Sequence, residues 1–168
     1  MALILLSATT AGYYDLRWRR IPNWLVIATV GFSIVWHVAT GGLAGLGKSL
    51  AGLLVGTAVF LPLFLIRGMG AGDVKLCGAL GAAVRYPQVF TLLIISVAIT
   101  GLMALCWILW EWSVKETLAN IVDILDRFLH GRFSPHPVLN TGNKSAAAVP
   151  FGVSVAIATW VFVLIGAQ

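Results

Sequence analysis

The sequence predicts an all-α polytopic membrane protein with six transmembrane helices and one amphipathic helix on the cytoplasmic surface. Two observations support this. Of the 168 residues, 60% are hydrophobic and only 10% are charged, and the apolar residues form long runs separated by loops rich in Arg and Lys. A soluble domain keeps about a quarter of its residues charged. The chain therefore fits a single membrane-embedded domain over residues 1–168, with no room for a sizeable soluble domain.

Six apolar segments are candidates for the transmembrane helices, because a helix needs about 20 residues to cross the hydrocarbon layer. They cover residues 2–14, 23–40, 48–66, 73–85, 88–110 and 146–167. The first and fourth segments are short. The first becomes long enough if it continues past Asp15 toward Trp18, and the fourth is rich in small residues that suit close helix packing.

The distribution of positive charge predicts the orientation of these helices. Nine of the 11 Lys and Arg residues lie in or directly beside the first, third and fifth loops, and the other two are Lys48 and Arg85. Positively charged loops stay on the cytoplasmic side of the membrane. We therefore expect those three loops inside and both termini outside. All six acidic residues also lie on the predicted cytoplasmic side.

The fifth loop, at about residues 111–145, is the one long connection. Apolar residues recur at helical spacing from Val114 to Phe128, with charged residues between them. This pattern is typical of an amphipathic helix that lies on the membrane surface. Residues 131–145 are rich in Pro, Gly, Asn and Ser, which predicts a mobile loop. We interpret it as a connector in preference to a gate over a membrane-embedded site.

Two acids at the predicted cytoplasmic boundary are candidate catalytic residues. Asp15 ends the first segment and Asp73 begins the fourth. Ionisable groups at membrane depth are costly and often functional. The structural alternative is a boundary charge or, for Asp73, a helix N-cap. Two carboxylates held within a few ångströms share a proton, so one can activate water while the other polarises a peptide carbonyl. This chemistry needs no metal or other cofactor.

Three short motifs occur in order along the chain. They are Asp15 with Ile21-Pro22-Asn23, then Gly70-Ala71-Gly72-Asp73, then Val149-Pro150-Phe151-Gly152. Their order and spacing, on six expected helices, resemble the type IV prepilin peptidases, which are GxGD membrane aspartic proteases. The resemblance implies an endopeptidase of the bacterial cytoplasmic membrane, with Asp15 and Asp73 as the catalytic pair. Its implied partners are membrane lipid, prepilin or pseudopilin substrates with short basic leaders, and pilus assembly machinery.

Cysteine usage indicates a branch of that family. Larger members carry a cytoplasmic insertion with paired CxxC motifs and also N-methylate the product. This chain lacks the insertion, and its two cysteines, Cys77 and Cys106, are isolated. It is therefore similar to the short, cleavage-only peptidases of Tad/Flp pilus systems, and we expect no methyltransferase activity.

Five further residues are expected to bind substrate or shape the site: Gly70, Gly72, Lys75, Pro150 and Gly152. The first two glycines would allow a sharp backbone turn and close approach of a substrate backbone. Lys75 adds positive charge near the acids. Pro150 and Gly152 are interpreted first as a loop-to-helix junction and second as lining of the site.

Two other functions stay open on the sequence alone. One is a small proton-coupled carrier in which Asp15 and Asp73 relay protons. The other is a non-catalytic assembly factor of a pilus or secretion system. A carrier would hold its acids near the bilayer midplane and would show inverted repeats. Neither feature is evident in this sequence, so the protease is preferred.

Three other patterns are rejected as sites. Residues 42–49 match the P-loop pattern, but they follow a membrane helix on the outer side instead of a buried strand. Nucleic-acid binding is not expected, because the positive charges lie in short loops between apolar runs. His37, His130 and His136 are too dispersed for a metal site, and we expect them at the surface.

Overall fold

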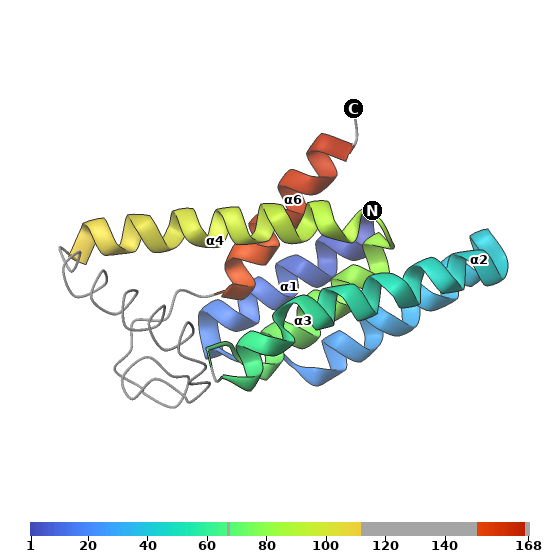
Figure 1. Ribbon diagram of the computed structural model, residues 1–168, viewed down its shortest axis with the longest axis horizontal. Helices are drawn as coiled ribbons and strands as arrows, with labels where there is room; N and C mark the ends of the chain where they lie inside the picture. The colour runs from blue at the N-terminus through green and yellow to red at the C-terminus, as the bar shows by residue number, and fades with distance from the viewer. Residues whose placement is uncertain (67, 112–150, 167–168) are drawn as a thin grey trace, which may run out of the picture.

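The structure, a computed structural model, describes residues 1–66, 68–111 and 151–166. All regular secondary structure in these residues is helical, as the sequence predicts. Figure 1 shows the helices, which are α1 (Ala2–Trp18), α2 (Asn23–Leu65), α3 (Ala71–Val84), α4 (Val89–Glu111) and α6 (Phe151–Gly166). The amphipathic helix and the loop predicted beyond residue 111 lie outside the described residues.

The second and third expected helices form the two arms of α2. The backbone leaves helical geometry at Gly42, which has φ 57° and ψ −143°. This conformation is accessible to glycine because it has no Cβ. Figure 1 shows the chain reversing there, so that the two arms of α2 return alongside one another. The first arm, from Asn23 to Gly41, is about 28 Å long at 1.5 Å per residue, close to the thickness of the hydrocarbon layer.

Two helices are long and apolar enough to cross a membrane: α2, and α4 over Val89–Trp107. The other three described helices are shorter, at 17 residues for α1, 14 for α3 and 16 for α6. The six crossings therefore remain a prediction.

The distribution of residue types between surface and interior is that of a membrane protein. Large apolar side chains such as Leu6, Ile27, Leu54 and Ile94 are exposed on the outside of the bundle. Small polar side chains are buried between the helices: Ser7, Thr29, Ser33, Ser49, Ser96, Ser154 and Thr159. An extensive apolar exterior is typical of a surface that faces lipid, and small residues at the interfaces let helices approach closely.

Glycines allow α3 to pack directly against the second arm of α2. A Cβ atom on Gly52 would overlap the carbonyl of Gly81, and one on Gly56 would overlap the carbonyl of Cys77. The two backbones are therefore in contact at both positions. The small residues predicted to suit close packing of this segment serve that purpose.

The C-terminal end of α3 is held by side chains of both arms of α2. The Ser49 hydroxyl donates to the Ala82 carbonyl at 2.9 Å, and His37 Nε2 lies 3.0 Å from the Ala83 carbonyl oxygen. The last carbonyls of a helix have no partner within it, and each such hydrogen bond stabilises by about 1 kcal/mol. The expectation that His37 lies at the surface is wrong, because its ring is needed for this contact and is buried.

The remaining helices bring three helix ends together. α1 packs mainly against α6, and α6 also contacts α4. The indole Nε1 of Trp160 donates to Thr9 Oγ1 at 3.1 Å across the α1–α6 interface. Figure 1 shows the end of α1, the start of α3 and the start of α6 at the same end of the bundle. The candidate catalytic residues belong to these ends.

Candidate active site

Asp15 lies in the last turn of α1, where the helix is about to end. Arg19 ends the helix in the left-handed conformation, with φ 50°, and its backbone N–H donates to the Asp15 carbonyl at 2.8 Å. Pro22 is the N-cap residue of α2, and a proline disfavours helical geometry in the residue before it. The side chain of Asp15 is 8% exposed. A carboxylate so deeply buried requires hydrogen-bond partners.

The first turn of α6 supplies those partners. The backbone N–H of Gly152 donates to Asp15 Oδ2 at 2.7 Å, and the N–H of Val153 also donates to this carboxylate. The first N–H groups of a helix have no partner within it. They carry the positive end of the helix dipole, which favours an acidic group at this place. Asp15 therefore caps α6 from another helix.

Glycine is required at position 152 because Asp15 lies directly against its backbone. A Cβ atom there would lie 2.8 Å from Asp15 Cβ and 2.9 Å from Oδ2. Gly12 has the same role one turn earlier on α1, where a Cβ would lie 2.9 Å from Ala156 Cβ. The two glycines let α1 and α6 approach closely enough for the Gly152 hydrogen bond.

Asp73 lies in the first turn of α3 and is half-buried. Gly70 is the N-cap residue of this helix, and its backbone N–H donates to the Asp73 carboxylate. This is one half of a capping box, in which the acidic side chain at the third helical position accepts from the N-cap N–H. The structural alternative considered for Asp73 was a helix N-cap. The N-cap residue is instead Gly70, three positions before Asp73.

The two carboxylates lie near one another in space. Asp15 is in the last turn of α1 and Asp73 is in the first turn of α3, and these two helix ends lie at the same end of the bundle (Figure 1). The two acids are far apart in sequence. Helix packing alone brings them together, and like charges at short range favour a shared proton.

Gly70 and Gly72 lie beside the acids, although for a different reason from the one expected. Neither has a positive φ, and Gly70 is extended with φ −73°. The sharp turn expected here therefore does not depend on glycine. Instead, a Cβ on Gly70 would lie 3.1 Å from Asp73 Oδ2, and one on Gly72 would lie 3.3 Å from Ile21 Cβ. These glycines make room for the acid and for the chain between α1 and α2.

Lys75 connects two of the sequence motifs. Its Nζ donates to Asn23 Oδ1 at 3.2 Å, which joins α3 to the start of α2. Within the described residues it forms no ion pair with either acid. Pro150, the remaining residue expected to shape the site, lies outside them.

Sequence reasoning missed Gly12 and the N–H group of Val153. Gly12 lies three residues before Asp15 and so shares its face of the helix, which is a signal that could have identified it. Val153 acts through its backbone and leaves no such signal.

In the part of the chain that the structure describes, no group of three or more His, Cys, Asp or Glu residues could hold a metal ion.

Comparison with known families shows which family the chain belongs to. The model of the type IV leader peptidase family matches residues 2–105. The chain belongs to the type IV leader peptidase family. The matched range contains α1 to α3 and both acids, whereas α6 lies beyond it. No curated protein and no solved structure matches the chain significantly.

Proposed function

We propose that this protein is an aspartic endopeptidase that removes short basic leaders from type IV prepilin-like precursors at the cytoplasmic face of a bacterial membrane. The observation that carries the proposal is that Asp15, in the last turn of α1, and Asp73, in the first turn of α3, lie at the same end of the bundle, where α1 contacts α3 (Figure 1). Membership of the leader peptidase family supports the substrate class.

In this proposal the two carboxylates hold one proton between them and titrate as a pair. The ionised member takes a proton from water, and the protonated member donates a hydrogen bond to the scissile carbonyl. The N–H groups of Gly152 and Val153 hold the Asp15 side chain in one orientation. Such preorganisation matters because a misplacement of about 1 Å can cost 100-fold in rate.

The position of the acids at helix ends supports cleavage at the membrane boundary. A prepilin keeps its apolar helix in the bilayer and its basic leader in the cytoplasm, so the junction between them would reach this depth. We further propose that the enzyme acts on Flp-type precursors and does not methylate its product. The support is the isolation of Cys77 and Cys106, which form no CxxC motif.

The test is cleavage of a synthetic precursor by purified protein in lipid nanodiscs. The substrate is a basic leader, a glycine and an apolar helix, and the product is identified by mass spectrometry. We expect a single cut at the leader–helix junction and an unmodified new N-terminus. A cut several residues inside the apolar helix would contradict the boundary site. Methylation when S-adenosylmethionine is added would contradict the cleavage-only assignment, and no cleavage would favour the assembly-factor alternative.

A further inference from the structure

A pocket of about 510 Å³ opens at the end of the bundle opposite to Asp15 and Asp73. The first residues of α1, the first arm of α2 and the connection between α3 and α4 line it. Ile4 at the pocket and Asp15 lie 11 residues apart on α1, roughly 16 Å along the helix axis. The pocket is therefore separate from the candidate active site.

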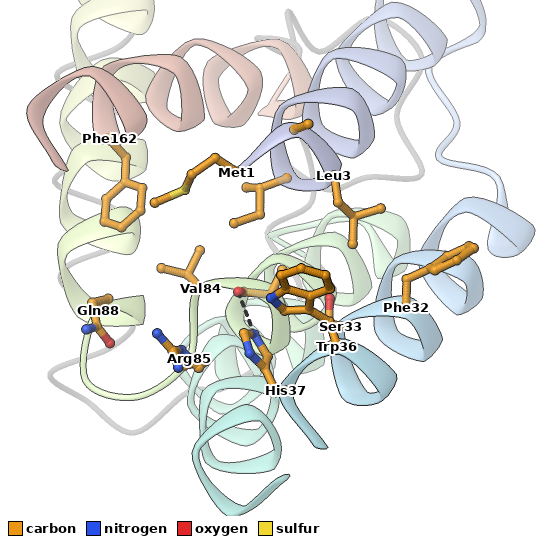
Figure 2. Close-up of a pocket in the computed structure, with 13 residues that line it drawn as sticks. Met1, Leu3, Phe32, Ser33, Trp36, His37, Val84, Arg85, Gln88 and Phe162 are labelled. Atoms are coloured by element: carbon orange, nitrogen blue, oxygen red, sulfur yellow. Dashed lines mark hydrogen bonds between the residues drawn. The ribbon is translucent and has the colours of Figure 1, made fainter. Parts of the chain in front are cut away.

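The pocket has an apolar side and a polar side. Figure 2 shows Met1, Leu3 and Phe162 along one side, with Arg85 and the other polar residues opposite. Phe32 also lines the pocket and is 64% exposed on the outside of the bundle. The pocket is therefore continuous with the apolar outer surface, so a hydrocarbon chain could enter it from the bilayer.

The polar side of the pocket holds a cation, the guanidinium of Arg85. Arg85 forms no ion pair or side-chain hydrogen bond within the described residues. Its backbone has φ 71° and ψ 165°, a region that essentially only glycine adopts and that is frequent at functional sites. Asp15 and Asp73 lie at the far ends of their helices and cannot neutralise it. An anion from outside the chain would complement this charge.

His37 adds a second unsatisfied polar group on this side. Its ring is 7% exposed, and Nε2 is 3.0 Å from the Ala83 carbonyl oxygen. Nδ1 has no hydrogen-bond partner in the residues that the structure describes. When Nε2 donates to this carbonyl, Nδ1 of the neutral ring is a hydrogen-bond acceptor and cannot bind a phosphate oxygen, so the charge on the polar side of the pocket comes from Arg85.

We propose that this pocket binds one anionic phospholipid from the bilayer. An acyl chain lies between Leu3 and Phe162, and the phosphate pairs with Arg85. The proposal rests on the membrane location of the protein and is independent of its proposed peptidase activity. Arg85 directly follows the last residue of α3, where a transmembrane helix would reach the lipid head groups.

The first test compares two lipids that differ in head-group charge. Purified protein in detergent micelles is mixed with phosphatidylglycerol or with phosphatidylcholine of the same acyl chains, and bound lipid is counted by native mass spectrometry. We expect one phosphatidylglycerol bound about tenfold more tightly than phosphatidylcholine, which is the size of effect that one charge-assisted hydrogen bond can give. Equal binding of the two lipids would overturn the proposal.

Two pairs of variants locate the site. Arg85→Gln should lose about tenfold in affinity for phosphatidylglycerol, whereas Lys48→Gln should not. Lys48 carries the same charge, and its carbonyl accepts from the Tyr86 N–H beside Arg85, but it does not line the pocket. Leu3→Trp should lower lipid occupancy severalfold by filling the pocket. Leu6→Trp, on the exposed face of the same helix, should leave occupancy unchanged.

The controls distinguish the lipid from simpler ligands. Equal losses in the Arg85 and Lys48 variants would show a general attraction of surface charge and would overturn the site. Displacement of the lipid by millimolar inorganic phosphate would show an anion site without a lipid chain, which would also overturn it. Leu3→Trp tests the apolar half and leaves Arg85 in place, so the proposal stays testable if Arg85→Gln does not fold.

Discussion

The backbone N–H of Gly152 donates a 2.7 Å hydrogen bond to Asp15 Oδ2, across 137 positions of sequence. This bond joins the end of α1 to the start of α6 and orients one of the two acids. Because Asp15 Cβ also lies against the Gly152 backbone, neither residue can move without the other. The start of α6 is thus part of the candidate active site.

We expect Gly152→Ala to lower cleavage by about tenfold or more, because the new methyl group would push the Asp15 carboxylate away from Asp73. The matched control is Gly166→Ala on the same helix, where no heavy atom lies within 4 Å of the added Cβ. Initial rates with the synthetic precursor should separate the two variants. A Gly152→Ala enzyme of normal activity would mean that α6 does not position Asp15.

Asp15→Asn and Asp73→Asn should each lower cleavage by about 100- to 10,000-fold, since an amide cannot act as general base or share the proton. In the Asp15→Asn variant the side-chain amide keeps an oxygen that can accept from the Gly152 N–H, so the fold should persist. Thermal unfolding in detergent checks this. If one variant cleaved at the normal rate while the other did not, the paired mechanism would be wrong, and a single-acid role would replace it.

Gly52→Ala should destabilise the protein by about 1–3 kcal/mol, because its Cβ would overlap the Gly81 carbonyl and force α2 and α3 apart. Gly47→Ala is the control on the same arm of α2, with nothing within 4 Å of the added atom. It should be neutral or slightly stabilising, as expected for replacing a glycine within a helix. Unfolding by denaturant in mixed micelles measures both. Equal stability of the two variants would contradict the tight backbone contact.

Cysteines introduced at Lys48 and at Arg20 should be labelled from opposite sides of the membrane. The two positions lie at either end of the apolar stretch that contains the first arm of α2, and the positive charge near Arg20 favours the cytoplasmic side. A membrane-impermeant maleimide applied to intact cells and to inverted vesicles distinguishes them. Cys77 and Cys106 are free thiols and should first be replaced by alanine. Labelling of both positions from one side would exclude the six-helix topology.

The sequence by itself determined the helical class, the membrane character and the two candidate acids. Hydropathy and charge are local properties, so runs of apolar residues reveal the helices from Ala2 to Trp18 and from Val89 to Glu111 without any knowledge of packing. Asp15 and Asp73 were identifiable because each acid interrupts an apolar pattern beside a short motif. The match over residues 2–105 confirms the family resemblance, and the catalytic roles of the two acids stay a prediction.

How these segments meet could be learned only from the three-dimensional structure. Three contacts join residues that are distant in sequence. They are the contact of Gly152 with Asp15, the contact of the buried His37 ring with the Ala83 carbonyl, and the close approach of Gly52 to Gly81. Helical periodicity states which residues share a face, but it does not state which helix that face will meet. The missing information is the shape of each interface, which depends on where small residues let two backbones touch. The glycines at positions 70 and 72, which were expected to allow a sharp turn, instead leave room for the side chains of Asp73 and Ile21.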